Sequence, residues 1–129
     1  MTDLADRYRA YLDCLNAREL DRLGEHVRED VQHNGNAFGL AGYRDMLRDD
    51  FRRIPDLRFE IEMLVVDESH VAARLVFDCA PVGEFLGLPV HGRRVRFHEN
   101  VLYTYRDGRI ADVRSVIDTV AIAAQLAGG

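Results

Sequence analysis

The sequence lacks the features that mark several large classes of protein. No apolar run approaches the roughly 20 residues that cross a membrane, and residues 1–16 lack the apolar core of a signal peptide. The only cysteines, Cys14 and Cys79, lie far apart without a CxxC spacing, so a disulfide framework or a zinc site has little support. We therefore predict a cytoplasmic protein with two buried thiols and no membrane partner.

Common catalytic and nucleotide-binding motifs are also missing. The sequence has no GxSxG, no glycine-rich phosphate loop and no Cys/His pair at an informative spacing, which removes the common hydrolases and nucleotide-binding proteins. A metal site would need His33, His98 and a carboxylate to converge, and no HxH or HExxH spacing supports this. We predict no metal.

The composition is that of an ordinary globular protein. Hydrophobic residues make up 47% and charged residues 30% of the 129 residues. Seventeen Lys+Arg against 22 Asp+Glu give a net charge of -5, and the basic residues are scattered rather than gathered in a stripe. Nucleic acid is therefore not an expected partner. The length predicts a single domain over residues 1–129.

The first half of the chain has helical periodicity. Apolar residues at helical spacing predict helices over residues 2–16, 18–26 and 40–54. Thr2 is the expected N-cap of the first helix, and Pro55 ends the third. Between the second and third, residues 31–36 predict a short strand and a turn that places polar groups at an edge.

The second half has the period of two that is typical of strands. Alternation predicts strands over residues 57–65, 71–78, 93–105 and 109–118, with residues 83–92 as a loop. A short Ala-rich helix is expected over residues 119–126. Helices followed by a meander of antiparallel strands predict an α+β fold, in which the helices cover one face of a curved sheet.

The turn between the last two strands decides which side chains share a face with Asp118, because a shift of one residue flips every side chain. If residues 106–108 form a three-residue loop with a glycine bulge, His98 and Asn100 share a face with Arg114 and Asp118. We favour this register and predict that this polar face lines a pocket. The opposite, apolar face would then serve for packing or as a subunit interface.

The other register remains open. If Asp107-Gly108 alone form a two-residue turn, Phe97 and Glu99 join the face of Asp118 in place of His98. The two registers therefore predict different neighbours for the same carboxylate.

Asp118 has two interpretations. A carboxylate in a poorly solvated pocket has a raised pKa, which suits proton transfer near neutral pH. Alternatively, Asp118 is the N-cap of the last helix, which is what the spacing alone favours. Arg114 on the same face would hold the carboxylate ionised or stabilise an oxyanion, or it forms a surface ion pair with Asp112 or Glu99.

The remaining candidates are two histidines and two aromatic residues. His33 and His98 have the chemistry of an acid, a base or a hydrogen-bond partner near pH 7, although a single histidine is more often structural. From the apolar stripes of the first and third predicted helices we add Tyr8 and Phe51 to the predicted pocket.

Three motifs occur in an order that resembles the SnoaL-like polyketide cyclases. They are Gly-Glu-Phe-Leu-Gly-Leu-Pro at residues 83–89, Gly-Arg-Arg-Val at residues 92–95, and the segment that begins Asp-Gly-Arg-Ile at residues 107–118. These cyclases belong to the superfamily of nuclear transport factor 2, ketosteroid isomerase and limonene epoxide hydrolase. The resemblance spans nearly the whole chain. It implies a cone-shaped α+β fold of the cystatin-like kind, usually dimeric, with a deep pocket and no cofactor.

The resemblance also bears on single residues. In similar cyclases the aspartate that closes the last strand is the general acid/base of an intramolecular aldol ring closure, and it matches Asp118. Arg114 matches an arginine of some cyclases, and His33 falls where they carry a polar pocket residue. Many relatives have Thr-His where this chain has Ala80-Pro81, and tryptophans where it has Arg114 and Ile117. The resemblance therefore leaves the substrate open.

The sequence thus predicts a cofactor-independent polyketide cyclase-like or isomerase-like enzyme acting on a small apolar or aromatic ketone or ester. Asp118 and His33 are the predicted catalytic residues. The predicted substrate pocket contains His98, Arg114, Asn100, Phe51 and Tyr8. A homodimer is expected.

Two alternatives stay in view. One is a non-catalytic small-molecule-binding domain of the same fold, because fold does not settle activity. The other is an epoxide hydrolase, against which Arg74 is followed two residues on by Val76 rather than by a carboxylate.

Overall fold

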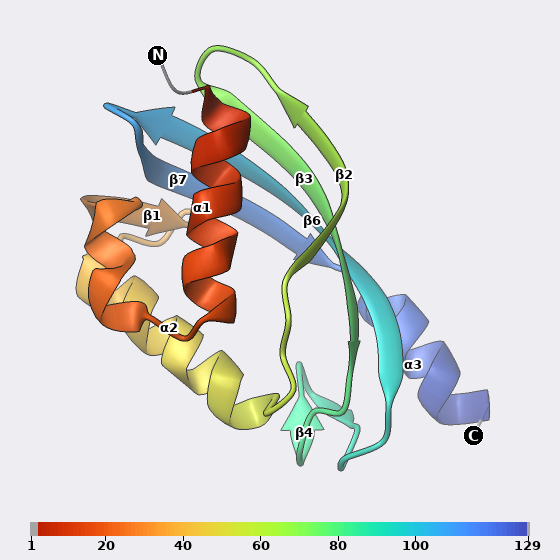
Figure 1. Ribbon diagram of the computed structural model, residues 1–129. Coiled ribbons are helices and arrows are strands. Elements are labelled where there is room, and N and C mark those ends of the chain that lie inside the picture. The colour runs from red at the N-terminus through yellow and green to blue at the C-terminus, as the bar shows by residue number, and fades with distance from the viewer. Residues whose placement is uncertain (1–2, 129) are drawn as a thin grey trace.

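The computed structural model describes residues 3–128, and within them helices pack on one side of a curved sheet (Figure 1). In chain order the elements are α1 (Leu4–Asn16), the 3₁₀ helix η1 (Leu20–Glu25), β1 (Val27–His33), α2 (Gly39–Arg53), β2 (Glu60–Val66), β3 (His70–Cys79), β4 (Glu84–Phe85), β5 (Leu88–Pro89), β6 (Val95–Arg106), β7 (Arg109–Ile117) and α3 (Thr119–Gly128).

The main sheet is mixed and unclosed. Its strand order is β1-β7-β6-β3-β2, with β1 parallel to β7 and the other neighbours antiparallel. Helices α1 and α2 lie on the same side of this sheet, and α3 lies beyond the end of β7 (Figure 1). The core fills the space between these layers. The predicted α+β class, a curved mixed sheet covered by the N-terminal helices, is confirmed.

The helices start and stop largely where their sequence signals lie. Asp3 caps α1, since its Oδ1 accepts a hydrogen bond of 2.9 Å from the backbone N–H of Asp6. The predicted cap, Thr2, lies outside the described residues. Helix α2 ends at Arg53, two residues before Pro55. The second predicted helix is the shorter 3₁₀ helix η1.

The turn between β6 and β7 has two central residues, so the predicted three-residue loop is wrong. Arg106 pairs with Arg109, and Asp107 and Gly108 between them have φ angles of 53° and 77°, as in a type I′ turn.

A bulge then restores the predicted grouping of side chains by another route. Tyr105 pairs with Ile110 but Thr104 pairs with Asp112, which leaves Ala111 as an extra residue in β7. The even-numbered residues of β6 up to Thr104 and those of β7 from Asp112 onward consequently still share one face.

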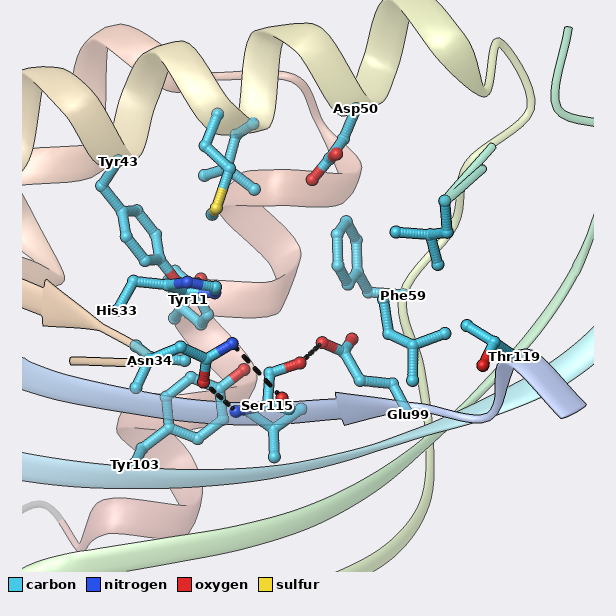
Figure 2. Close-up of a pocket in the computed structure, with 16 residues that line it drawn as sticks. Tyr11, His33, Asn34, Tyr43, Asp50, Phe59, Glu99, Tyr103, Ser115 and Thr119 are labelled. Carbon is cyan, nitrogen blue, oxygen red and sulfur yellow. Dashed lines mark hydrogen bonds between the residues drawn. The ribbon is translucent and has the colours of Figure 1, made fainter. Parts of the chain in front are cut away.

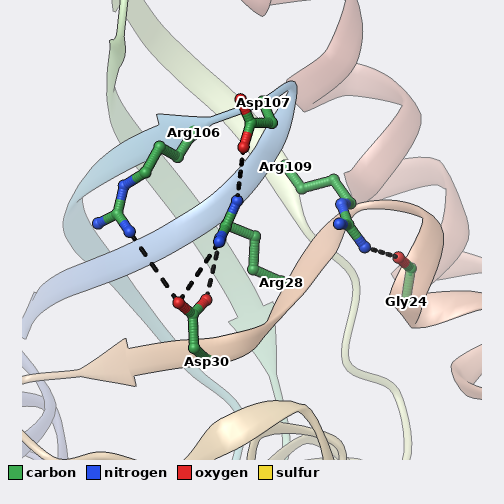
Figure 3. A network of polar contacts seen from close by, with 6 residues as sticks. All are labelled: Gly24, Arg28, Asp30, Arg106, Asp107 and Arg109. Carbon is green, nitrogen blue, oxygen red and sulfur yellow. Dashed lines mark hydrogen bonds and ion pairs between the residues drawn. The ribbon is translucent and has the colours of Figure 1, made fainter.

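Ion pairs tie this turn to β1 (Figure 3). Arg28 Nη1 lies 2.9 Å from Asp107 Oδ2, and its Nε lies 2.9 Å from Asp30 Oδ1. Arg109 Nη1 donates to the carbonyl of Gly24 at 3.4 Å. The exposed pairs are individually weak, but together they join the turn to the parallel edge strand.

The pocket lies on the other face of the sheet from the one predicted, whereas the predicted packing role of the apolar face is confirmed. Helices cover the concave face, and a covered face must be mostly apolar. This face carries the odd-numbered residues of β6, which are buried or half-buried, whereas the even-numbered ones point outward to the convex face. The apolar face therefore lines the cavity, and the predicted polar face does not.

Other expectations concern loops, thiols and membranes. Residues 83–92, predicted as a loop, contain the short hairpin β4–β5. Cys14 and Cys79 are buried free thiols, as predicted. Between residues 3 and 128, none of the helices has the length and apolarity needed to cross a bilayer. The cytoplasmic location stays a prediction.

Candidate active site

A cavity of about 440 Å³ lies between α2, α1 and the concave face of the sheet (Figure 2). This volume is in the range of small-molecule sites. Its lining residues are Tyr11, His33, Asn34, Tyr43, Met46, Leu47, Asp50, Phe59, Leu86, Glu99, Val101, Tyr103, Val113, Ser115, Ile117 and Thr119.

Asp50 points into the cavity from α2 (Figure 2). Leu47 lies three residues before Asp50, and Tyr43 lies seven before it, so the buried stripe of α2 brings Asp50 to the same side. Burial raises the pKa of Asp50 to about 7, and the negative charges of Glu99 and Asp49 add to the rise, while Arg53 opposes it. This carboxyl therefore titrates near neutral pH.

Glu99 lines the same cavity as Asp50 but comes from β6, on the sheet side (Figure 2). It is the charged member of the concave face of that strand, between Phe97 and Val101. Burial raises the pKa of Glu99, and a hydrogen bond donated by the Ser115 hydroxyl opposes the rise.

Asn34 fixes the position of Ser115. Its Oδ1 accepts a 2.8 Å hydrogen bond from the backbone N–H of Ser115, and its Nδ2 donates to the carbonyl of the same residue at 3.3 Å. Asn34 has a φ of 48°, which asparagine tolerates better than most residues. The turn after β1 thus positions Ser115, whose hydroxyl donates a hydrogen bond to Glu99.

Tyrosine hydroxyls and a histidine form the other polar part of the lining. The hydroxyls of Tyr11 and Tyr43 lie 2.7 Å apart. The ring of His33 stacks on Phe38, with centroids 5.4 Å apart and planes inclined by 6°. Burial lowers the pKa of His33, and the charge of Asp112 opposes that shift. His33 is therefore mainly neutral at pH 7.

A second, aromatic chamber of about 100 Å³ adjoins the first. The two share Asp50, Phe59, Leu86, Glu99 and Ile117. The aromatic chamber adds three phenylalanines, Phe77, Phe85 and Phe97, together with Ile54 and Leu57. The two carboxyls thus stand where a polar chamber meets an aromatic one.

Asp118 lies outside both chambers. It is exposed, and its Oδ1 accepts a 3.0 Å hydrogen bond from the backbone N–H of Ala121 at the start of α3. Its own N–H donates to the carbonyl of His98 at 3.0 Å. The helix-cap interpretation of Asp118 is therefore confirmed.

Of the other predicted site residues, His33 alone lines the cavity. Three lie on the convex face in polar contacts: His98 Nε2 is 2.8 Å from Glu62 Oε2, Asn100 Oδ1 accepts from Arg74 at 3.0 Å, and Arg114 Nε is 3.1 Å from Asp112 Oδ2. Their predicted place in the pocket followed from choosing the polar face. The ion pair of Arg114 with Asp112 is the alternative that the sequence left open.

Tyr8 and Phe51 do not line the cavity, but each contacts an aromatic residue that does. The Tyr8 hydroxyl donates to that of Tyr103 at 3.3 Å from a fully buried position. Phe51 contacts the edge of Phe59, with ring centroids 6.3 Å apart, and the guanidinium of Arg18 lies 3.9 Å from its centroid.

Sequence reasoning missed Asp50, Ser115 and the roles of Glu99 and Asn34. The sequence did contain a signal for the two carboxyls. A carboxylate on the apolar stripe of a helix or on the apolar face of a strand indicates a buried polar group, which is more informative than an exposed one. Between residues 3 and 128, no three His, Cys, Asp or Glu side chains form a cluster suited to a metal ion.

The chain is similar to known proteins of one family. Curated proteins include no significant match. The crystal structure of a SnoaL-like polyketide cyclase from Agrobacterium tumefaciens is 56% identical, with a TM-score of 0.97 over 98% of this chain and 99% of that one. IdmH from Streptomyces antibioticus shares the fold at 22% identity, with a TM-score of 0.83 over 98% and 99% of the two chains.

TsrD from Streptomyces laurentii is 26% identical, with a TM-score of 0.80 over 95% of this chain and 91% of that one. The family model for the SnoaL-like polyketide cyclases matches residues 5–126. The resemblance seen in the motifs of residues 83–118 is thereby confirmed, and the chain belongs to the SnoaL-like polyketide cyclase family.

Proposed function

We propose that this protein catalyses a cofactor-independent ring closure or proton transfer on a small apolar or aromatic ketone or ester, with Asp50 and Glu99 as its acid/base pair. The family supports a cyclase-like or isomerase-like function in general. The observation that carries the proposal is that two carboxyls line one cavity whose other lining side chains are uncharged at pH 7.

The surroundings of the two carboxyls divide the roles between them. The Ser115 hydroxyl stabilises Glu99 as a carboxylate, and the charge of Glu99 in turn helps to keep the proton on Asp50. Burial raises the pKa of both carboxyls, but the hydrogen bond from Ser115 favours the charged form of Glu99, and a pair in such unequal surroundings suits one base and one acid. Glu99 is then the base, and Asp50 is the acid.

In a ring closure of the aldol type, the Glu99 carboxylate takes the proton from the carbon beside a carbonyl, which leaves an enolate. The carbon of the enolate attacks a second carbonyl of the same molecule and forms the carbon–carbon bond. The carbonyl oxygen that becomes an alkoxide receives the proton of Asp50. Glu99 is then protonated and Asp50 ionised, and proton exchange through solvent after product release restores both.

Neutral hydrogen-bond donors are placed to stabilise the enolate oxygen. The paired hydroxyls of Tyr11 and Tyr43 and the neutral ring of His33 line the same chamber as the carboxyls. The sequence contains no lysine, so a Schiff base between the protein's side chains and a ketone is not available. Acid/base chemistry by the carboxyls is the route that these residues support.

Exchange of the α-protons of alkyl phenyl ketones for deuterium, followed by proton NMR in D₂O, tests this proposal. Wild-type protein should accelerate the exchange, and Glu99→Gln should abolish most of the acceleration. Asp118→Asn is the matched control, because it removes a carboxylate outside the cavity. Undiminished exchange by Glu99→Gln would refute the base, and ketone binding without any exchange would favour a binding domain.

For the partner, we propose a second copy of the chain on the convex face of the sheet. Four apolar side chains are well exposed there, with fractions of 59% for Leu102 on β6 and 71% for Val116 on β7, and with Met63 and Val65 on the edge strand β2. Exposed apolar patches of this kind mark interaction sites. A two-fold axis through this patch would bring the same residues of both copies together.

A further inference from the structure

The hairpin β4–β5 turns through Leu86 and Gly87, whose φ angles are 53° and 77°. Positive φ at both central residues is the pattern of a type I′ turn, which favours Asn-Gly. Leucine in this conformation is strained, because its Cβ crowds the backbone. Strained positions that the surrounding structure holds in place are often functional.

Leu86 stands where the two chambers meet the solvent. It lines both of them, together with Asp50 and Glu99, while 50% of its surface stays exposed. Beside it, Phe85 is buried against Phe97, with ring centroids 5.8 Å apart. The buried phenylalanine anchors the hairpin, and the turn presents Leu86 to the rim of the cavity.

The base of the hairpin is bound to the end of α2. The backbone N–H of Val82 donates to the carbonyl of Arg53 at 2.7 Å, and Arg53 Nη1 donates to the carbonyl of Glu84 at 3.4 Å. The N–H of His91 donates to the carbonyl of Gly83 at 2.8 Å. These bonds hold Leu86 over the cavity against the preference of its backbone.

We propose that Leu86 determines specificity: its side chain closes the aromatic chamber toward solvent, so that this chamber accepts only a short alkyl substituent of the ligand. The inference rests on the proposed function in placing the ligand beside Asp50 and Glu99. A chamber of about 100 Å³ is smaller than the roughly 150 Å³ cavity that binds benzene. The 440 Å³ chamber holds the body of the ligand.

Binding of alkyl phenyl ketones, from acetophenone to hexanophenone, tests this by NMR titration of backbone amides. In the wild type, affinity should rise about fourfold for each methylene that is buried and then level off once the chamber is full. In Leu86→Ala the levelling should come at a chain two to three carbons longer, because the substitution removes three carbons.

Val82→Ala is the matched control. Val82 is also 50% exposed and lies in the same segment, but it lines neither chamber. It should leave the chain-length profile unchanged. If Leu86→Ala levels off at the same chain length as the wild type, or Val82→Ala shifts the profile equally, the inference is overturned.

Leu86→Asn separates the role of the side chain from that of the turn. Asn-Gly suits a type I′ turn, so the melting temperature should stay level or rise. A lower melting temperature would show that Leu86 stabilises the turn and would overturn the inference. Binding is measured apart from exchange, so the two proposals can fail separately. A shifted chain-length profile in Leu86→Ala together with undiminished exchange by Glu99→Gln would refute the catalytic proposal and keep this one. An unshifted profile together with lost exchange by Glu99→Gln would refute this inference and keep the catalytic proposal.

Discussion

Asp50 and Glu99 place two acidic groups in a cavity whose lining, among residues 3–128, includes no arginine. Two carboxylates in one poorly solvated site repel each other, so one of them retains a proton at a pH where an exposed carboxyl would be ionised. Burial is the main cause of the raised pKa of Asp50, and the charge of Glu99 adds to it. The pair suits acid/base catalysis, but it destabilises the folded protein because ionising both carboxyls in this site is unfavourable.

Asp50→Asn should therefore act in opposite directions on activity and stability. We expect ring closure of a substrate with two carbonyls to fall about 100-fold or more, because Asp50 protonates the alkoxide of that step and a general acid contributes that much. The free energy of unfolding at pH 8 should rise by about 1 kcal/mol or more, since a buried charge is removed. Urea unfolding measures the second effect. A destabilised variant at pH 8 would contradict the account.

The pH dependence of stability follows from the same carboxyl. Its pKa of about 7 in the folded protein exceeds the value of about 3.9 expected for an unfolded chain. Between these values the folded state binds more protons, so the contribution of Asp50 to stability is present at low pH and is lost as pH rises to about 7. The stability difference between Asp50→Asn and wild type should grow from pH 4 to pH 7 and then stay constant. A difference that is independent of pH would rule this out.

At the scale of elements, the sequence signals predicted most helices and strands but not which face of the sheet is covered. Periodicity identified α1, α2 and the long strands to within a few residues. The register depended on the bulge at Ala111, which has no sequence signal of its own. Choosing the polar face for the pocket misplaced His98, Asn100 and Arg114, because the helices need the apolar face.

Asp118 and Asp50 differ in whether local sequence predicts their role. Asp118 has the cap signal, and its structural role follows from local sequence. Asp50 looks like an exposed helix residue until its spacing from Tyr43 and Leu47 is counted. Its neighbour Glu99 comes from a strand 49 residues later, so their meeting depends on tertiary packing and could not be predicted from local sequence.

Asp118→Ala should weaken α3 without affecting catalysis. The lost cap to Ala121 is expected to cost about 1 kcal/mol of stability, measurable by urea unfolding. Ketone exchange per folded molecule should stay at the wild-type level. A loss of exchange comparable to that of Glu99→Gln would return the catalytic role to Asp118.

At the scale of the whole molecule, the curved sheet uses its two faces differently. The concave face encloses the cavity, and the convex face leaves Leu102 and Val116 exposed beside polar pairs such as Arg74 with Glu62. If a second copy covers that face, the apolar side chains lose contact with water and the polar pairs form its rim.

Leu102→Glu tests that arrangement. In a two-fold dimer the substitution places two new charges in one apolar interface, which is unfavourable. Light scattering should give a dimeric mass for the wild type and a monomeric mass for the variant, with ketone binding retained. Exposed Val120 on α3 provides a control, since Val120→Glu should leave the mass unchanged. A monomeric wild type would refute the dimer.

The central claim is that Asp50 shares a cavity with Glu99 and holds a proton near neutral pH. Carbon-13 NMR of protein labelled at the aspartate carboxyl carbons measures this directly as a titration from pH 3 to 9. The account predicts one aspartate that titrates near pH 7, whose signal is absent from Asp50→Asn and whose midpoint falls in Glu99→Gln. If every aspartate titrates in the ordinary acidic range, the claim is contradicted.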